Sequence, residues 1–447
     1  MAKPKIVIIG GGAAGTTCAF ELRKLDKEAE ITIVEKTGNA EYCPCALPYV
    51  LAGEIKSFDD IFIFQKSDYE NNNIRLLLNT TVVSIDKKGK KINCRDSKKT
   101  TALAYDKLVL AAGSAPKFPP IPGLEKAIPL ALKTIDDAKR ISQNASPGGK
   151  NRAVVVGAGL VGLELAAALS KRGEKVSLIE ARDRLLPAVL DKDMGEQAGR
   201  YAESLGIETY LNAGIEKIDK NKVCFGQNSL PFDKLYICAG MKASAGLAKQ
   251  AGLDCGEAVE VNRRMQTSDK DIYACGDCVF SQELNTGEKV LSQLGTVAVR
   301  QGKTAARNLL GGKETAPPVL NTTITKVGEL FIGSAGLTLE RARQKNLRAM
   351  ASKYTTQARS EYYPSSSPIT VKLVFDQKGK LLGGQIIGKE EVAGRIDLLS
   401  LAIGKGMNLD DLIEMETCYN PASAPINEPL TVAAEIGKKK LNTIKNE

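Results

Sequence analysis

The sequence predicts an α/β protein in which two similar domains, one nested within the other, precede a third, α+β domain. Three observations support this fold class. A glycine-rich turn between a strand-like and a helix-like segment occurs twice, near-copies of another segment close each half, and both patterns stop near residue 320. At 447 residues the chain is long enough for two or three separate hydrophobic cores.

The first copy of the glycine pattern opens the chain. The apolar run KIVIIG leads directly into Gly10-x-Gly12-x-x-Gly15, then a helical stretch over 13–24, then the run ITIVEK with Glu35. Glycines at this spacing make a tight turn and let a pyrophosphate approach the backbone at a helix N-terminus. An acid ending the second strand accepts hydrogen bonds from ribose hydroxyls. The segment therefore predicts a Rossmann-like dinucleotide site with Glu35 on the ribose.

The second copy lies near the middle of the chain. AVVVGAGLVGLELAAAL contains Gly157-x-Gly159-x-x-Gly162, and the run VSLIEA then places Glu180 at the end of the next strand. One such motif is weak evidence, but its repetition in the same strand, turn and helix context favours two dinucleotide sites.

The domain boundaries follow from a second repeat. YDKLVLAAGSAP over 105–116 closely resembles FDKLYICAGMKA over 232–243, and IYACGDCV later supplies one more strand-like run, followed by Asp277. Alternating runs such as ITVKLVF and LLGGQIIG indicate a sheet in the last part. The expected domains are 1–115 together with 245–320, the nested segment 116–244, and 321–447.

Composition excludes several classes of function. The net charge of +10 is spread along the chain, so no nucleic-acid partner is expected. There is no long apolar run for a membrane span and no signal-peptide pattern at the start, so we expect a cytoplasmic protein. Ten cysteines in a reducing compartment do not indicate a disulfide framework. The absence of histidine excludes Ser-His and Cys-His nucleophile pairs and histidine metal sites.

Two cysteines two residues apart stand out near the N-terminus, in EYCPCALPYVL over 41–51. Cys43 and Cys45 could form a metal site, a disulfide or a redox-active thiol. A metal site is disfavoured because the pair lacks two further ligands and its spacing is not C-x2–4-C, so we expect no metal.

The order of short motifs resembles one known family along essentially the whole chain. IGGGAAG, CALPY, AAGSAP, VGAGLVGLE, IYACGDC, LGTVAVRQG and CYNPASAP occur as in the FAD-dependent pyridine nucleotide-disulfide oxidoreductases. The resemblance implies FAD on the first fingerprint, NAD(P)H on the second, and a C-terminal dimerisation domain that forms a homodimer. With Cys45 before LPY, no C-x4-C and no histidine, the chain resembles the single-cysteine branch of coenzyme A-disulfide reductases, NADH oxidases and persulfide reductases.

The resemblance also implies roles for individual side chains. Cys45 would be the redox cysteine, activated by a lowered pKa and cycling through a mixed disulfide with a small thiol. Cys43 is expected to be a bystander, because a 43–45 disulfide would be tight. Tyr362, Tyr363 and Tyr419 resemble tyrosines that reach the partner subunit's site, where a phenol could donate a proton.

Further contacts are implied for the cofactors and for coenzyme A. Glu164 resembles the family's acid near the nicotinamide, and Glu180 favours NADH, although nearby Arg182 and Arg184 leave NADPH open. Arg23 and Lys24 lie where relatives keep basic groups for coenzyme A phosphates. The remaining expected cofactor contacts are Ala14, Lys36, Gly113, Lys133, Gly276, Asp277 and Thr296.

The expected function is electron transfer from NAD(P)H through FAD and Cys45 to a small disulfide, persulfide or polysulfide, with coenzyme A disulfide or persulfide favoured. One alternative is an NADH oxidase that forms hydrogen peroxide, and another is a non-enzymatic flavoprotein redox sensor. Two departures from the family bear on the choice. Glu41 replaces the serine of the S-x3-C pattern of coenzyme A reductases. Ala13 stands where oxygen- and peroxide-reducing members often have histidine.

Overall fold

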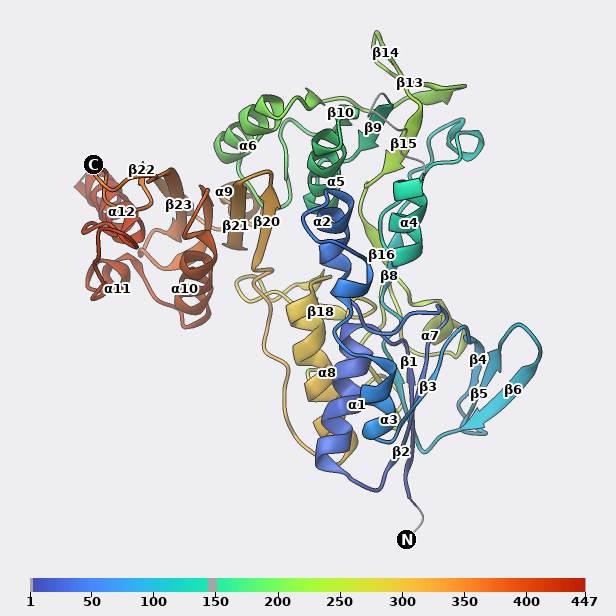
Figure 1. The fold of residues 1–447 in the computed structure, drawn as a ribbon. Coiled ribbons are helices and arrows are strands. Elements are labelled where there is room, and N and C mark those ends of the chain that lie inside the picture. The colour runs from blue at the N-terminus through green and yellow to red at the C-terminus, as the bar shows by residue number, and fades with distance from the viewer. Residues whose placement is uncertain (1–2, 144–150, 447) are drawn as a thin grey trace.

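The computed structural model describes residues 3–143 and 151–446. Figure 1 shows the first domain at the lower right, the second above it and the third at the left. Two of the sheets are parallel and the large sheet of the third domain is antiparallel, so the predicted fold class is confirmed.

The first domain is built on a five-stranded parallel sheet in the order β17-β7-β1-β2-β3. The last strand in sequence, β17, pairs with β7 and so completes a sheet begun more than a hundred residues earlier. The strands are β1 (Lys5–Ile9), β2 (Glu30–Val34), β3 (Ile74–Leu77), β7 (Lys107–Leu110) and β17 (Ile272–Ala274).

Two long helices pack side by side against this sheet, as Figure 1 shows for α1 (Ala13–Leu25) and α8 (Gly295–Leu309). Their close approach depends on Gly302, where a Cβ would lie 2.4 Å from the carbonyl oxygen of Ala14. The domain also contains α3 (Lys66–Asn71), α7 (Gly246–Gln250), β18 (Phe280–Gln282) and β19 (Lys289–Leu291).

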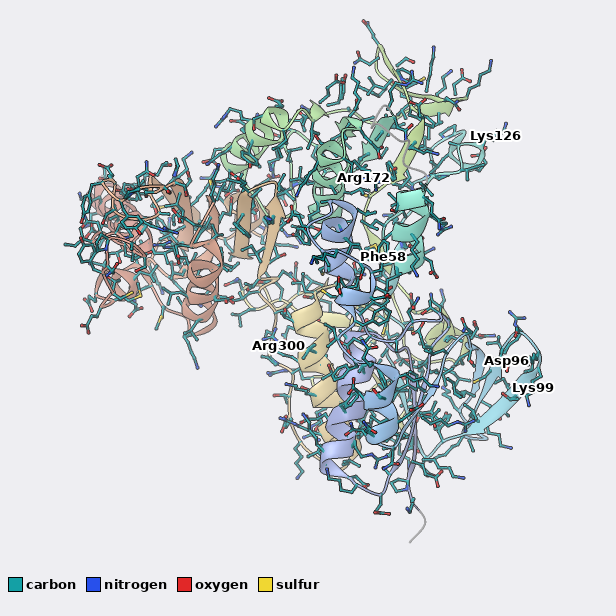
Figure 2. The ribbon with its side chains drawn as sticks, in the orientation of Figure 1. Phe58, Asp96, Lys99, Lys126, Arg172 and Arg300 are labelled. Atoms are coloured by element: carbon teal, nitrogen blue, oxygen red, sulfur yellow. The ribbon has the colours of Figure 1, made fainter. Side chains whose placement is uncertain are left out.

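A three-stranded antiparallel meander extends the first domain: β4 (Thr81–Asp86), β5 (Lys91–Arg95) and β6 (Thr100–Ala104). Figure 2 shows Asp96 and Lys99 at the far end of this meander. The Asp96 carboxylate accepts the backbone N–H groups of Lys98 and Lys99 at 2.7 and 2.8 Å, which closes the turn.

The second domain repeats the plan with a parallel sheet in the order β11-β10-β9-β15. Its strands are β9 (Arg152–Val156), β10 (Lys175–Ile179), β11 (Glu208–Tyr210) and β15 (Lys234–Ile237), and its helices α4 (Ile135–Gln143), α5 (Leu160–Lys171) and α6 (Lys192–Ser204). A second meander comprises β12 (Lys217–Asp219), β13 (Lys222–Phe225) and β14 (Asn228–Pro231). The short helix η3 (Leu124–Lys126) lies much earlier in the chain, between β8 and α4. The chain enters and leaves this domain through β8 (Ser114–Pro116) and β16 (Met241–Ala243), which pair with each other.

The third domain has an antiparallel sheet in the order β20-β21-β24-β23-β22, with helices packed on it. Its strands are β20 (Thr323–Val327), β21 (Leu330–Gly336), β22 (Ala349–Gln357), β23 (Pro368–Asp376) and β24 (Leu381–Gly388). Its helices are α9 (Leu339–Gln344), α10 (Val392–Gly404), α11 (Leu409–Ile413) and α12 (Pro429–Asn446). Over residues 3–143 and 151–446, no helix has both the length and the apolar character needed to cross a bilayer.

A buried polar cluster fastens the third domain to the second. Asp191, the residue before α6, accepts a hydrogen bond from the side-chain amide of Gln385 at 2.7 Å. The ammonium of Lys372 lies 3.1 Å from the same carboxylate and 2.6 Å from that of Asp193. Lys372 and Asp191 are both almost fully buried, so each charge depends on the other for compensation.

We expect Lys372→Ala to destabilise the protein by about 3 kcal/mol, because it leaves the buried carboxylate of Asp191 without its cation. Lys353→Ala is the matched control: this lysine also pairs with Asp193, at 2.9 Å, but both side chains are well exposed. The control should cost less than about 1 kcal/mol. The chain has no tryptophan, so urea unfolding followed by far-UV circular dichroism measures both changes in stability. Equal losses of stability in the two variants would contradict the burial of the Lys372–Asp191 pair.

Candidate functional site

The first glycine loop lies at the carboxyl end of β1 and leads into α1. Gly10 has φ +108°, and a Cβ there would lie 2.2 Å from the carbonyl oxygen of Ala111. A Cβ on Gly15 would lie 2.0 Å from the carbonyl oxygen of Gly10, so both glycines are required for the turn to form. Gly12 differs, because a Cβ there would meet no atom within 4 Å. The space above Gly12, at the N-terminus of α1, is therefore open to a ligand.

Glu35 holds this loop in place. Its carboxylate accepts the backbone N–H of Gly11 at 2.8 Å through one oxygen. The other oxygen accepts the backbone N–H and the hydroxyl of Thr37, each at 2.8 Å. A carboxylate has about four acceptor positions, so Glu35 keeps capacity for a ribose hydroxyl. Lys36, the next residue, is exposed.

The second loop repeats this geometry. A Cβ on Gly157 would lie 2.4 Å from the carbonyl oxygen of Cys238, one on Gly162 would lie 1.9 Å from that of Gly157, and Gly159 is open. Glu180 accepts the backbone N–H of Ala158 at 2.8 Å and that of Arg182 at 2.9 Å. Each half of the chain thus presents one open glycine beside one carboxylate.

Residues far along the chain complete the first site. Gly276 packs so closely on α1 that a Cβ would lie 2.8 Å from that of Ala14, and its N–H donates to Gln301 on α8 at 2.9 Å. The side chains of Ser292 and Gln293, just before α8, each bury a polar atom that has no partner among the described residues. Thr296, in the first turn of α8, is exposed.

These features fit a bound FAD. Orphaned buried polar groups need a partner, and Ser292 and Gln293 stand at the N-terminus of a helix whose first turn packs beside the open glycine loop. Gly10, Gly12, Gly15, Glu35 and Gly276 would hold the dinucleotide part.

Lys133, Ser114 and Asp277 form a polar group between the first two domains. The hydroxyl of Ser114 donates to Asp277 at 2.8 Å, and the ammonium of Lys133 lies 3.2 Å from Ser114 and 3.4 Å from Asp277. Gly113, with φ +67°, precedes this serine and has open space around it. The structure therefore brings four of the predicted cofactor contacts, Gly113, Lys133, Gly276 and Asp277, to one region.

The two neighbouring cysteines lie on a short 3-10 turn, η1 (Pro44–Ala46), which runs into α2 (Leu47–Leu51). The segment is fixed from the side by η2 (Asp59–Ile61), where the N–H of Cys43 donates to the carbonyl of Ile61 at 2.9 Å. Cys45 is accessible and Cys43 is half-buried.

Cys43 and Cys45 influence each other's ionisation, because a negative charge on one thiol disfavours the loss of a proton from the other. The Cys45 thiol and, to a smaller extent, the nearby backbone N–H groups lower the pKa of Cys43 to about 6. The Cys43 thiol, together with burial, raises the pKa of Cys45, and the nearby ammonium of Lys133 offsets this only in part. The expected lowering of the pKa of Cys45 is therefore not found, because the Cys43 thiol and burial both act against it.

Glu164, on α5, also acts on this region. Burial raises its pKa to about 7, although the hydroxyl of Thr325 donates to it at 2.5 Å. Thr325 belongs to β20 of the third domain, so one hydrogen bond joins the predicted nicotinamide acid to another domain. The negative charge of Glu164 contributes to the raised pKa of Cys45.

Glu41 is a feature that the sequence indicated only as a departure from a family pattern. Its side chain is buried, one carboxylate oxygen has no partner among the described residues, and burial raises its pKa to about 7. The nearby Thr16 hydroxyl offsets part of this rise, and it donates to the carbonyl of Gly11 at 3.0 Å and contacts the hydroxyl of Tyr69 at 3.3 Å. Nothing in the local sequence, a glutamate followed by Tyr42, indicated that the side chain of Glu41 would be buried.

Arg23 does not match the role expected for it. Its five N–H groups donate to the carbonyl oxygens of Asn72, Asp26, Lys27, Ala29 and Asn73 at 2.6–3.1 Å. A guanidinium has five N–H donors, so none is left for a phosphate. Arg23 instead ties the end of α1 to the segment before β3, whereas Lys24 is exposed.

The predicted tyrosines separate into two groups. The hydroxyls of Tyr362 and Tyr419 are 2.7 Å apart, and both rings are exposed. Their hydrogen bond lowers the pKa of Tyr362 and raises that of Tyr419. Tyr363 lies instead under the guanidinium of Arg359, 5.9 Å from the ring centre. In Figure 1, α11 and α12 of the third domain lie well away from α2.

No group of three or more histidine, cysteine, aspartate or glutamate side chains in the described part of the chain is arranged to hold a metal ion.

Comparison with known proteins adds the following. The family model for pyridine nucleotide-disulphide oxidoreductase matches residues 4–302, and the model for its dimerisation domain matches residues 322–428. An NADH oxidase of Methanocaldococcus jannaschii is 41% identical over 445 residues, which cover 98% of this chain and 99% of that protein. A coenzyme A-dependent NAD(P)H sulfur oxidoreductase of Pyrococcus furiosus is 31% identical over 447 residues, 98% of this chain and 100% of that one. The solved NAD-dependent persulfide reductase from A. fulgidus is 33% identical with a TM-score of 0.95, over 98% of this chain and 84% of that chain.

The open glycines allow the two nucleotide sites to be tested separately. Gly12→Val should fold but bind no FAD, because Gly12 has extended dihedral angles and space for a side chain that only the pyrophosphate would occupy. Gly159→Val should retain FAD and lose NADH binding for the same reason. Flavin absorbance of the purified proteins and NADH titration measure the two effects. A yellow Gly12→Val variant with wild-type flavin content would contradict the site.

Glu41 should make stability depend on pH. A carboxyl group with a folded-state pKa of about 7 and an unfolded value near 4.3 binds its proton more tightly when folded, so stability falls as the pH rises through this range. Glu41→Gln should remove this penalty, with a gain that grows between about pH 5 and about pH 8 toward about 3 kcal/mol. Thermal unfolding at both pH values measures it. Glu70→Gln, on an exposed glutamate, is the control and should give no pH-dependent gain.

Proposed function

The chain belongs to the pyridine nucleotide-disulphide oxidoreductases and is an NAD(P)H-dependent flavoprotein enzyme of that family, and we propose that it reduces a sulfur–sulfur bond in a small thiol compound. Coenzyme A disulfide or persulfide is the favoured acceptor, and Cys45 is the thiol that reacts with it. The observation that carries the proposal is an accessible thiol at the start of α2, influenced by Glu164 of the second domain and by Lys133.

When bound, FAD takes a hydride from a nicotinamide and supplies two electrons to a nearby sulfur. The chain itself positions the reactants. The open glycines hold the two dinucleotides at helix N-termini, and Glu35 and Glu180 keep the loops in shape. Cys45 forms a mixed disulfide with one half of the acceptor, whose other half leaves as a thiol.

The sulfur acceptor is supported by the relatives and by the residues of this site. A coenzyme A-dependent sulfur oxidoreductase and a persulfide reductase match nearly the whole chain at 31% and 33% identity. Lys24 is exposed at the end of α1 and remains the candidate for a coenzyme A phosphate, without Arg23.

An NADH oxidase that forms hydrogen peroxide is the second candidate. The 41% identity to a relative named NADH oxidase favours an oxidase. Oxygen would then take electrons without any thiol, so a requirement for Cys45 separates the two functions. A non-enzymatic flavoprotein sensor is not favoured by any of these observations.

NADH is the favoured donor. Glu180 repels a 2′-phosphate, as expected from the sequence. Of the two arginines that could offset it, Arg184 is buried and donates to the carbonyl of Leu190 and to the carboxylates of Asp183 and Glu340. Only Arg182 is exposed to meet a phosphate.

The working unit we propose is a homodimer in which tyrosines of one chain serve the other chain's Cys45. The match to a dimerisation domain supports it, as do the exposed Tyr362 and Tyr419. Tyr362 is the better acid of the pair because its hydrogen bond from Tyr419 lowers its pKa. Tyr363, engaged by Arg359, is a weaker candidate.

Cys45→Ser tests the function. We expect the variant to bind FAD and to be reduced by NADH, but to lose NADH-dependent reduction of coenzyme A disulfide, because a hydroxyl cannot form the mixed disulfide. Cys224→Ser, on β13 of the second domain, is the control and should keep wild-type rates. Stopped-flow absorbance and thiol release measure the two steps. If Cys45→Ser keeps full disulfide reduction, the proposal is wrong. If the variant consumes oxygen at the wild-type rate and the wild type itself does not reduce coenzyme A disulfide, the oxidase is favoured.

A further inference from the structure

A cleft in the first domain lies apart from the glycine loops and the cysteines. It has a volume of about 380 Å³ and lies between the turn that joins β4 to β5 and the segment that leads into β17. Asp271, in its lining, directly precedes β17, whereas the first glycine loop follows the end of β1. Because β1, β7 and β17 are parallel, the cleft lies at the amino edge of the sheet and the dinucleotide loop at the opposite, carboxyl edge.

The side chain of Tyr105 lines this cleft and has an unmet hydrogen bond. Only 3% of the residue is exposed, and its hydroxyl is buried without a hydrogen-bond partner among the described residues. Buried polar groups are nearly always paired, so an unpaired hydroxyl beside a cleft indicates a missing partner. Burial, together with the charges of nearby carboxylates, raises the pKa of Tyr105 to about 12. The phenol therefore keeps its proton and needs an acceptor.

Lysines on two sides of the cleft have N–H groups to spare. Lys90 lies 2.6 Å from one carboxylate oxygen of Asp271, and Lys107, just outside the lining, lies 2.7 Å from the other. Lys87 donates to the carbonyl of Gly252 at 2.9 Å and forms no ion pair within residues 3–143 and 151–446. An ammonium has three N–H donors, so Lys87 and Lys90 each retain donors that can reach a ligand.

Lys270 and the acidic residues complete the charge balance. The ammonium of Lys270 is exposed and forms no ion pair in the part of the chain that the structure describes. One oxygen of Asp269 accepts the backbone N–H of Asp271 at 2.9 Å. Asp86, outside the lining, accepts a backbone N–H of its own turn at 2.9 Å. The three lining lysines and Lys107 thus outnumber these three carboxylates, and the unpaired groups of the cleft are mostly donors.

We propose that this cleft binds a small oxyanion of the phosphate class, held by the ammonium groups of Lys87, Lys90 and Lys270 and by the hydroxyl of Tyr105. A phosphate group presents several acceptor oxygens and a negative charge, which is what a cleft with spare N–H and O–H donors lacks. A water molecule would satisfy the hydroxyl of Tyr105 but would leave the surplus positive charge uncompensated.

The size and place of the cleft separate this ligand from the cofactors. One water molecule occupies about 30 Å³ of liquid, so a cleft of about 380 Å³ has room for a phosphate group and for part of a molecule attached to it. In Figure 1 the β4–β6 meander lies well away from α2 and from the second domain. The proposed site is therefore independent of the sulfur acceptor that we propose for Cys45.

Calorimetric titration of the FAD-loaded enzyme with inorganic phosphate, at low ionic strength, tests the site. We expect saturable binding that Tyr105→Phe weakens about tenfold, because a hydrogen bond to a charged oxygen is lost. Lys87→Ala should weaken it about threefold, as expected for an exposed charge. Lys88→Ala is the matched control: it removes the same charge from the same turn, but Lys88 is outside the lining, so the affinity should not change.

Two further variants exclude the other places where a phosphate could bind. Gly159→Val blocks the second glycine loop, and Lys24→Ala removes the candidate group for coenzyme A, so both should bind phosphate as the wild type does. Glycerol phosphate, titrated in the same way, distinguishes the sources of the ligand. Tighter binding than that of inorganic phosphate would support an organic phosphate, and weaker binding would support the free ion.

Thermal unfolding with and without phosphate provides a second measurement. Tyr105→Phe removes only an unpaired hydroxyl, so without phosphate it should be at least as stable as the wild type. Phosphate should raise the unfolding temperature of the wild type more than that of the variant. The proposal is overturned if phosphate gives neither saturable heat nor stabilisation. It is also overturned if Lys88→Ala weakens binding as much as Lys87→Ala, or if Tyr105→Phe binds phosphate as tightly as the wild type.

Discussion

The close packing of backbone on backbone at the two glycine loops is the constraint on which the rest of the structure depends. A Cβ on Gly15 would lie 2.0 Å from a carbonyl oxygen, and a Cβ on Gly162 would lie 1.9 Å from one. Both distances are too short for atoms that are not bonded to each other. Only a missing side chain lets the first turn of each helix rest on its own loop. The same packing leaves Gly12 and Gly159 uncovered, so the stability of the turn and the opening for a nucleotide have one origin.

The connections between domains bring the residues of the candidate site together. β8 and β16 pair where the chain enters and leaves the second domain, which fixes that domain over the first. The Thr325–Glu164 hydrogen bond and the Asp191 cluster then hold the third domain against the second. Cys45 comes from the first domain, and Glu164 reaches its surroundings from the second. A change at any of these contacts should therefore affect the site without touching a reactant.

Much of this could be predicted from local sequence. The strand, glycine turn and helix of each half follow from short-range patterns, and α1 begins at Ala13 as expected and ends one residue later, at Leu25. The near-copies 105–116 and 232–243 contain β8 and β16, which proved to be partners of each other. Arg23 could not be predicted in the same way, because its acceptors include Asn72 and Asn73, which are distant in sequence. The burial of Glu41 likewise depends on tertiary structure, and the cofactor roles of Lys36 and Thr296 stay predictions.

The lack of histidine raises the question of how protons are handled at neutral pH, and the structure offers a physical answer. Three groups in this part of the molecule have pKa values near the unperturbed histidine value of about 6.5. Hydrogen bonds bring the pKa of Cys43 down to about 6, and burial brings those of Glu41 and Glu164 up to about 7. Each of the three can therefore exist in either protonation state under the same conditions, which is what a proton donor or acceptor for thiol chemistry requires. The groups reach this range by opposite causes, so entry of water into the site would move their pKa values apart. Water would lower the pKa of both glutamates, and it would raise that of Cys43 by weakening the hydrogen bonds that keep it low. Exclusion of water therefore keeps all three pKa values in the range that a proton donor or acceptor at neutral pH requires.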